Sequence, residues 1–452
     1  MKTLREIISD KCVECGLCQK ECAFLQRRGA PKSLASGRRA ASDIPFECSL
    51  CGLCSVVCPL GLDPARMFRG LRGEAVARGD GDYPEHAVIR GYERRGASKR
   101  YSFYALPEGS DTVLFPGCTL SGSRSETVVK LFEHLRAGIP SLGIVLDCCT
   151  KPSRDLGRTG YFKAMFDEMK SYLLDRGVRR VLTACPNCYV IFRDYGAPLE
   201  AVTVYEILAG TGIPDAPAPS MASAPVTVHD PCVVRFQKPL HDAVRALIAC
   251  RGLVVEEMAH HGERAVCCGE GGAAGFLFPE LSEKWRAIRR KEAGGRRIVA
   301  YCAGCAEALG REAPVVHVLD LLFDPAAALN GESKVSRPPL TYWKRMRMKR
   351  RFKKILPAAA TRERTFTAGE KASKGSAPLR LVLLLLVIGA IVAVRATGLT
   401  SHLDRVFSIS LLDAIGGRLT LAFLVGILLA AVSLVPILYR RAGGEREKGP
   451  RR

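Results

Sequence analysis

The chain has 452 residues, enough for two to four domains, and contains 19 cysteines. Disulfide scaffolds are short exported domains, and Met1–Arg5 shows no secretory signal pattern, so we expect reduced thiols that bind metal. The net charge of +22 is uneven, because residues 337–380 hold 14 Lys and Arg against two acidic residues while residues 1–336 carry a net +5. This distribution excludes a basic nucleic-acid footprint on the main folded part, and we expect no nucleic-acid partner.

Residues 1–75 carry one cysteine pattern twice and are predicted to form a helical, ferredoxin-like module with two [4Fe–4S] clusters. The second copy, Cys48-Ser-Leu-Cys51-Gly-Leu-Cys54-Ser-Val-Val-Cys58-Pro59, has the bacterial ferredoxin spacing, in which three thiolates hold one cluster and the fourth reaches its neighbour. The first copy runs from Cys12 to Cys22 and has Ala23 where the proline would stand. The predicted ligands are Cys12, Cys15, Cys18 and Cys58 for one cluster and Cys48, Cys51, Cys54 and Cys22 for the other. Two structural zinc sites are the alternative, because paired C-x-x-C is also zinc spacing.

Residues 76–110 show no sustained hydrophobic period, and we interpret them as a connector. In residues 111–211, short β-branched runs that end in cysteine alternate with amphipathic helical stretches. The runs are Thr112–Cys118, Ile144–Cys149 and Val181–Cys188. Strands that alternate with helices predict a mostly parallel sheet, with the cysteines at the carboxyl ends of the strands.

The same pattern returns in residues 226–327, after a Pro/Ala-rich joint at 212–225. The matching segments are Val226–Cys232, Ala265–Gly269 and Ile298–Cys305, at offsets of 114, 119 and 117 residues. Both halves therefore contain a cysteine, a Cys-Cys pair and a C-x-x-C, which indicates an internal duplication.

This constellation, together with the ferredoxin module, resembles the cysteine-rich "CCG" domain family over roughly residues 5–325. The family includes heterodisulfide reductase subunits and the iron–sulfur subunits of glycolate oxidase and anaerobic glycerol-3-phosphate dehydrogenase. In heterodisulfide reductases each five-cysteine set holds a non-cubane [4Fe–4S] cluster, and the disulfide is cleaved between the two clusters. The resemblance implies one set of Cys118, Cys148, Cys149, Cys185 and Cys188 and a second set of Cys232, Cys267, Cys268, Cys302 and Cys305. If disulfide chemistry occurs, the second set is the candidate catalytic group.

One departure from the family pattern concerns the first set, which has Thr150 where a glycine is expected. Zinc is the alternative occupant, above all in the first set. The remaining cysteine, Cys250, is predicted to be a small buried hydrophobic residue.

The segment from Gly269 to Ala274 fits the dinucleotide fingerprint G-x-G-x-x-A, but we reject that interpretation because two candidate ligand cysteines directly precede it. The glycines are better explained by backbone that folds closely around a cluster. We therefore expect no flavin in this chain. His229, His260 and His261 are candidate proton donors to a thiolate, although a hydrogen-bonding structural role is the favoured expectation for each.

The C-terminal part is predicted to be a membrane end. Within a basic juxtamembrane linker at 328–378, the run 342–356 is predicted to lie on anionic lipid, with a solvated basic linker as the alternative. Transmembrane helices at 379–399 and 419–439 would follow around a loop at 400–418, with a basic tail at 440–452. An interfacial helix is the alternative for 379–399. Neither span contains histidine, so we expect no haem there.

The expected fold class is multidomain α/β and α+β: a helical ferredoxin-like module, duplicated α/β domains with parallel sheets, and a transmembrane hairpin. The preferred function is a membrane-anchored iron–sulfur subunit that passes electrons between a cytoplasmic flavoprotein dehydrogenase or redox carrier and the quinone pool, directly or through a membrane cytochrome. We expect it at the cytoplasmic membrane, with its iron–sulfur domains in the cytoplasm. The alternative is a heterodisulfide-reductase-like enzyme with thiol–disulfide chemistry at the non-cubane clusters.

Overall fold

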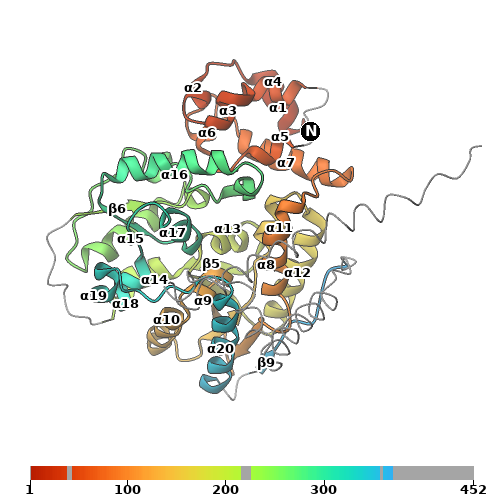
Figure 1. The fold of residues 1–452 in the computed structure, drawn as a ribbon. Coiled ribbons are helices and arrows are strands. Elements are labelled where there is room, and N and C mark those ends of the chain that lie inside the picture. The colour runs from red at the N-terminus through yellow and green to blue at the C-terminus, as the bar shows by residue number, and fades with distance from the viewer. Residues whose placement is uncertain (1, 38–42, 215–224, 357–359, 370–452) are drawn as a thin grey trace, which may run out of the picture. The chain divides into compact units, whose positions relative to one another are not determined.

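The structure is a computed structural model that describes residues 2–37, 43–214, 225–356 and 360–369 of the chain. An N-terminal helical module lies at the top of Figure 1, and two α/β domains lie below it. The fold class is mixed α/β with parallel sheets, as predicted for this part of the chain.

The N-terminal module consists of short helices around two cysteine loops. Gly16 directly precedes α2 with a φ of 78°, and Gly52 directly precedes α6 with a φ of 74°. Both have a left-handed conformation, which glycine adopts without steric cost. Phe24 and Phe68 pack edge to face in its core, with their ring centroids 5.1 Å apart. The helices are α1 (Leu4–Lys11), α2 (Leu17–Lys20), α3 (Ala23–Arg28), α4 (Pro31–Ser36), α5 (Ile44–Glu47), α6 (Leu53–Val56) and α7 (Pro64–Ala77).

The first α/β domain is built on a sheet of order β5-β4-β2-β3-β1-β9, in which β2 to β5 run parallel. Alternate residues of β2 enter different cores: Leu114 packs on the side of α10, and Val113 and Phe115 pack on the side of α12. Both faces of the sheet are therefore covered, as expected for parallel strands. The strands are β2 (Thr112–Phe115), β3 (Gly143–Leu146), β4 (Arg180–Thr183) and β5 (Glu200–Thr203). The helices are α9 (Cys118–Ser123), α10 (Ser125–Gly138), α11 (Lys151–Asp155), α12 (Thr159–Asp175), α13 (Pro186–Tyr195) and α14 (Val204–Thr211).

The second α/β domain has a smaller parallel sheet of order β6-β7-β8. Among the described residues, the strand predicted before Cys267 is absent from this sheet: a 3₁₀ turn, η3 (Gly262–Arg264), precedes the cysteine, and a parallel bridge joins Val255 to Val226 at the edge of β6. The strands are β6 (Val226–His229), β7 (Arg297–Ala300) and β8 (Val315–His317). The helical elements are η2 (Cys232–Val234), α15 (Lys238–Ala249), η4 (Gly271–Phe276), α16 (Pro279–Ala293), α17 (Ala303–Leu309), α18 (Val318–Phe323) and α19 (Pro325–Asn330).

Two segments outside the predicted domains complete the first sheet. The segment interpreted as a connector contains η1 (Pro84–His86), α8 (Ala87–Gly96) and β1 (Phe103–Leu106). The segment interpreted as a basic linker contains α20 (Leu340–Ile355) and β9 (Ala360–Arg362). Strand β1 pairs antiparallel with β3 on one side and with β9 on the other, so residues from both segments extend the sheet of the first domain.

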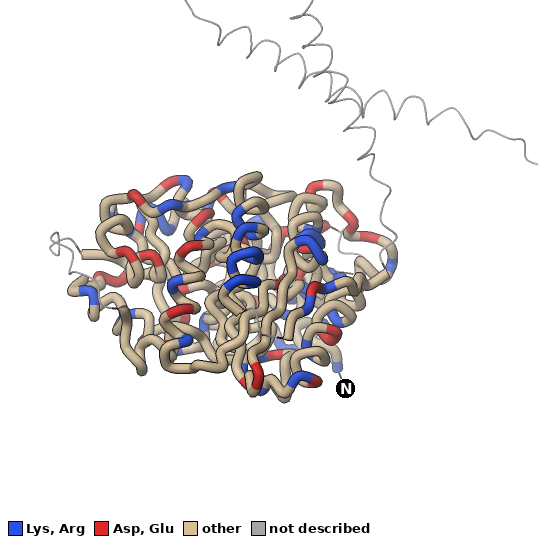
Figure 2. The backbone as a smooth tube through the Cα atoms, turned by 90° about the horizontal axis from the view of Figure 1, so that it is seen from below, with Lys and Arg blue, Asp and Glu red and all other residues tan. Residues whose placement is uncertain are grey.

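One face of α20 packs against the protein. The Phe352 ring meets Phe132 edge to face at 5.0 Å, and Arg345 donates a hydrogen bond to the Gly96 carbonyl at 3.1 Å. The helix is rich in Lys and Arg, which are blue in Figure 2, and Trp343 on it is exposed. The run predicted to lie on lipid is therefore, in part, a packed helix of the first domain.

Buried polar contacts join the two α/β domains. The Tyr205 hydroxyl lies 2.8 Å from the Ala184 carbonyl and 2.9 Å from the Tyr301 carbonyl, one in each domain. Arg124 forms a buried ion pair with Asp320 at 2.6 Å. A buried pair of this kind fixes the relative orientation of its elements, because separating the partners would leave an uncompensated charge.

The N-terminal module is anchored by the guanidinium of Arg72, which is fully buried. It donates to carbonyls of all three parts of the fold: Pro45, Phe46 and Cys48 at 2.9, 3.2 and 2.6 Å, Asp155 at 2.8 Å, and Gly272 at 2.6 Å. The three parts are therefore tied at a single side chain.

The C-terminal hairpin in the expected fold class must be corrected. Across the described residues we find no helix with both the length and the apolar character needed to span a bilayer. The predicted spans at 379–399 and 419–439, with their loop and basic tail, lie outside the described residues. The structure therefore gives no support to the hairpin as part of the fold class.

Arg72→Met should lower the free energy of unfolding by roughly 3–5 kcal/mol, because five buried carbonyls lose a charged donor. Urea unfolding followed by circular dichroism measures the change. Arg78→Met is the matched control, since Arg78 follows the same helix and its side chain is 58% exposed beside Asp80. Equal stability of the two variants would contradict the anchoring role.

Candidate metal centres

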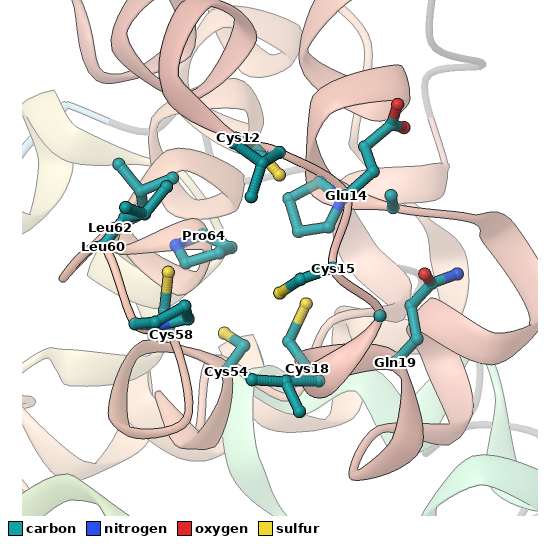
Figure 3. A pocket seen from close by; sticks show the side chains of 16 residues that line it. Cys12, Glu14, Cys15, Cys18, Gln19, Cys54, Cys58, Leu60, Leu62 and Pro64 are labelled. Atoms are coloured by element: carbon teal, nitrogen blue, oxygen red, sulfur yellow. The ribbon is translucent and has the colours of Figure 1, made fainter.

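The structure brings together the four thiols predicted for the first cluster. Cys12 and Cys15 come from the loop between α1 and α2, Cys18 lies at the start of α2, and Cys58 reaches them from the second loop (Figure 3). Burial, together with Cys12 and Cys15, raises the pKa of Cys18 to about 11. Cys54, which is predicted for the second cluster, also lines this cavity. The four sulfurs predicted for the first cluster converge from two loops and fit the ligand set of a [4Fe–4S] cluster.

The second predicted set also converges, with Cys22 crossing over from the first loop. Burial raises the pKa of Cys22 to about 12, with a further contribution from Cys51. Burial and the neighbouring Cys48, Cys51 and Cys22 raise the pKa of Cys54 well above its usual value. Clustered buried thiols of this kind are stabilised as thiolates when a metal ion binds them.

The first five-cysteine set lies at the carboxyl ends of β2, β3 and β4. Cys149 and Cys188 approach to 3.4 Å between their sulfurs, and the Cys118 and Cys148 side chains are hydrogen-bonded. Gly117 has a φ of 82°, and a Cβ at this position would lie 3.1 Å from the Cys188 sulfur. The glycine therefore keeps free the space into which the thiols point.

The family departure at Thr150 has a structural consequence. Thr150 follows the Cys-Cys pair with a φ of 54°, and Gly269 holds the matching position of the second domain with a φ of 95°. A left-handed conformation costs a non-glycine residue about 1–2 kcal/mol, which explains why glycine is expected here. The first set is complete despite this cost.

The second five-cysteine set is also assembled, around η2, the loop after η3 and the start of α17. Hydrogen bonds link Cys232 to Cys267, Cys267 to Cys268, and Cys268 to Cys305. The hydrogen bonds from Cys267 and Cys305 lower the pKa of Cys268 to about 5. Neighbouring thiols and burial raise the pKa values of Cys232 and Cys305 well above the usual value, so a bound metal ion would be needed to hold the whole set as thiolates.

The two five-cysteine sets meet. Cys185 of the first set is hydrogen-bonded to Cys302 of the second, and Asn187 lies 3.5 Å from the Cys302 sulfur. Cysteines of both sets line one cavity of about 380 Å³, together with Cys51 of the N-terminal module. The family resemblance implied that the two sets face each other, but sequence spacing did not indicate which thiols meet.

The N-terminal module approaches the second domain closely at this cavity. Arg235 donates to the Cys51 carbonyl at 3.0 and 3.1 Å and to the Ala265 carbonyl at 2.8 Å. A Cβ on Gly271 would lie 2.4 Å from the Ser49 carbonyl oxygen, so only glycine permits this approach. The glycines after Cys268 thus leave room for the ferredoxin loop as well as for the neighbouring Cys267 sulfur.

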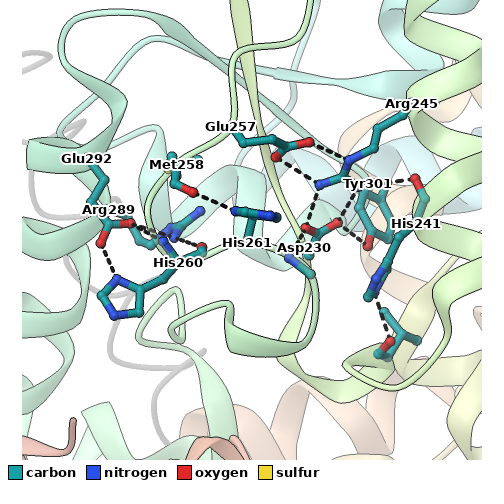
Figure 4. A network of polar contacts seen from close by, with 12 residues as sticks. Asp230, His241, Arg245, Glu257, Met258, His260, His261, Arg289, Glu292 and Tyr301 are labelled. Carbon is teal, nitrogen blue, oxygen red and sulfur yellow. Dashed lines mark hydrogen bonds and ion pairs between the residues drawn. The ribbon is translucent and has the colours of Figure 1, made fainter.

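A polar network that we did not predict holds the loop between β6 and Cys267 (Figure 4). The Asp230 carboxylate accepts bonds from Arg245 at 2.9 and 3.1 Å, from the Tyr301 hydroxyl at 2.8 Å and from the Gly262 amide at 2.7 Å. Burial acts to raise the pKa of Asp230, but hydrogen bonding to Arg245 outweighs it and the pKa is about 2. The only sequence signal was its position, two residues before Cys232.

The candidate histidines have different environments. His260 contacts Glu292 and Glu21, and the Nδ1 of His261 lies 2.8 Å from the Met258 carbonyl, so both have the expected structural partners. His229 is fully buried, and neither ring nitrogen has a hydrogen-bond partner among the described residues. One of its nitrogens lies within 4.8 Å of the Cys268 and Cys305 sulfurs.

The remaining cysteine corrects a prediction. Cys250, expected to be buried, is exposed at the end of α15. It belongs to none of the four cysteine sets described above.

Comparison with known proteins identifies the domains. Residues 8–62 match a 4Fe-4S dicluster domain, and residues 112–193 and 226–310 both match a cysteine-rich domain. The repeated match agrees with the duplication inferred from the cysteine offsets.

Three relatives show the context of these domains. The chain is 24% identical to a subunit of the dihydromethanophenazine:CoB–CoM heterodisulfide reductase of Methanosarcina mazei, over 63% of this chain and 83% of the relative. It is 23% identical to an EtfAB:quinone oxidoreductase of Syntrophomonas wolfei, over 53% of this chain and 38% of the relative. It is also 23% identical to a "Probable membrane-anchored ferredoxin" of Chromohalobacter salexigens, over 66% of this chain and 49% of the relative.

The domain matches and these relatives agree with the cysteine sets. The chain is an oxidoreductase component that binds iron–sulfur clusters. It belongs to the cysteine-rich (CCG) domain family of iron–sulfur oxidoreductases.

Proposed function

We propose that this chain is an iron–sulfur electron-transfer subunit that connects a flavoprotein dehydrogenase or another redox carrier to a quinone-linked acceptor. The observation that carries the proposal is the cavity at which Cys51, the first five-cysteine set and the second five-cysteine set meet. The relative named an EtfAB:quinone oxidoreductase supports an acceptor of this class. A quinone or a membrane cytochrome would then be the neighbouring component.

The four cysteine sets would hold four clusters. Each set would supply reversible one-electron chemistry through its bound iron, and buried thiolates would keep that iron away from water. Cubane [4Fe–4S] clusters would be held by Cys12, Cys15, Cys18 and Cys58 and by Cys22, Cys48, Cys51 and Cys54. Non-cubane clusters would be held by Cys118, Cys148, Cys149, Cys185 and Cys188 and by Cys232, Cys267, Cys268, Cys302 and Cys305, with zinc as the alternative in the first of these two sets.

A redox partner would approach at the first ferredoxin set. Cys15 is exposed there, and the rim of its cavity carries the exposed apolar side chains Val13, Leu17 and Leu60. The rate of electron transfer between proteins falls off with distance, so an exposed ligand lets a partner come close to the cluster. An exposed apolar rim is typical of a surface that contacts another protein.

Thiol–disulfide chemistry is a second candidate function. It is favoured by the hydrogen bond between Cys185 and Cys302, which brings two complete cysteine sets to one cavity of about 380 Å³. In such a reaction a disulfide takes up two electrons from the redox partner and two protons, its S–S bond breaks, and two thiols leave. The relative from a heterodisulfide reductase supports this candidate.

Chain prepared without oxygen should contain about 16 iron atoms, because four sets would each bind four. Cys268→Ala should remove one paramagnetic signal and about four irons, while leaving the ferredoxin-type signals intact. Cys250→Ala is the matched control, since this exposed thiol belongs to no set and its loss should change neither iron nor spectrum. About eight irons together with zinc would contradict clusters in the α/β domains.

The two candidate functions separate in a turnover assay with the isolated, cluster-loaded chain and a chemical electron donor. If the chain is an electron-transfer subunit, we expect that it does not reduce small disulfides and that it co-purifies with a flavoprotein dehydrogenase. Disulfide turnover that is lost in Cys302→Ser and retained in Cys250→Ser would instead establish the second function.

A further inference from the structure

The two α/β domains differ at one buried position beside their cysteine sets. The offset of 114 residues that aligns Cys118 with Cys232 also aligns Phe115 with His229. Phe115 ends β2 and His229 ends β6, and both side chains are fully buried. The duplication therefore presents a phenyl ring in one domain and an imidazole in the other.

Both rings lie beside equivalent cysteines. Phe115 packs in one buried cluster with Cys149 and Cys188. The counterparts of these cysteines are Cys268 and Cys305, and their sulfurs and a ring nitrogen of His229 all lie within 4.8 Å of one another. The imidazole thus occupies the place in the second domain that the phenyl ring occupies in the first.

The His229 ring needs a partner that the described residues do not supply, since both of its nitrogens are buried without a hydrogen bond. Leaving such a group unpaired costs about 1–3 kcal/mol. An imidazole ring carries at least one N–H donor whether it is neutral or protonated. The Cys268 and Cys305 sulfurs lie within 4.8 Å of a ring nitrogen, so these sulfurs and the group that they hold are candidate acceptors.

Charged side chains act on both sets. Arg345 acts on Cys118 and Glu93 acts on Cys148 of the first set. The fully buried Arg289 acts on Cys268 and Cys305 of the second set, and Arg235 and Lys151 act on its Cys232. Each set therefore faces an arginine. The imidazole is a difference that remains between them.

We propose that His229 is a tuning residue of the second cysteine set, whose ring N–H donates a hydrogen bond to a sulfur of the cluster held there. Reduction adds negative charge that is spread over the sulfurs, so a donor stabilises the reduced cluster and raises its reduction potential. Phe115 offers no donor to the first set. The inference rests on the proposed function, because it requires an iron–sulfur cluster in the second set.

The deciding experiment is a redox titration of the full chain, prepared without oxygen and followed by electron paramagnetic resonance. The second-set signal is the one that Cys268→Ala removes. His229→Phe, which copies the first domain, should shift that signal to a more negative midpoint potential at unchanged iron content. His229→Gln keeps an N–H donor, so the midpoint potential should shift less than in His229→Phe. The control Phe115→Leu should leave the second-set potential unchanged.

A second measurement on the unsubstituted chain keeps the proposal testable if His229→Phe fails to fold. Pulsed paramagnetic resonance should detect a weak nitrogen coupling, as expected for a hydrogen-bonded imidazole. A strong coupling would mean that the nitrogen binds iron directly, and would overturn the proposal. An unchanged midpoint potential in His229→Phe at full iron content would also overturn it while leaving the proposed function intact. Absence of iron from the second set of the unsubstituted chain would overturn both.

Discussion

The arrangement of the molecule depends on the buried guanidinium of Arg72, which binds carbonyls from the N-terminal module and from both α/β domains. A guanidinium cannot leave water without satisfying its donors, and here the acceptors are backbone atoms from three segments far apart in sequence. The contact also demands close packing of main chain. A Cβ on Gly157 would lie 2.5 Å from the Arg72 carbonyl carbon, so this position accepts only glycine.

The same requirement for close backbone approach brings the cysteine sets together. Gly271 and Gly272 let the loop after Cys268 lie against the backbone of Cys48 and Ser49. Arg235 then bridges the Cys51 carbonyl and the second domain. The ferredoxin loop, the second five-cysteine set and the first five-cysteine set consequently follow one another around one cavity, which is a prerequisite for passing electrons among them.

The duplicated domains keep their ligands but diverge around them. The first domain retains a full strand, β3, before its Cys-Cys pair, whereas the second reaches its pair through η3 and an isolated bridge. The first domain accepts a strained Thr150 where the second has Gly269. Thiol positions are therefore preserved while the backbone and the polar surroundings of each set differ, so the two sets need not have equal redox properties.

From the sequence by itself, local spacing predicted the two ferredoxin-type cysteine sets, the family resemblance implied the two five-cysteine sets, and the hydrophobic period indicated the alternation of strands and helices. The exchange of Cys22 and Cys58 between loops was also predictable. In the ferredoxin-type spacing the fourth cysteine of each run binds the neighbouring cluster and not the cluster held by the first three. Only the tertiary structure decided that Cys185 meets Cys302, that α20 and β9 complete the first domain, that Cys250 is exposed and that His229 is buried without a partner among the described residues. These features depend on contacts between segments distant in the chain, and hydrophobic patterns record which face of an element is buried but not what it is buried against.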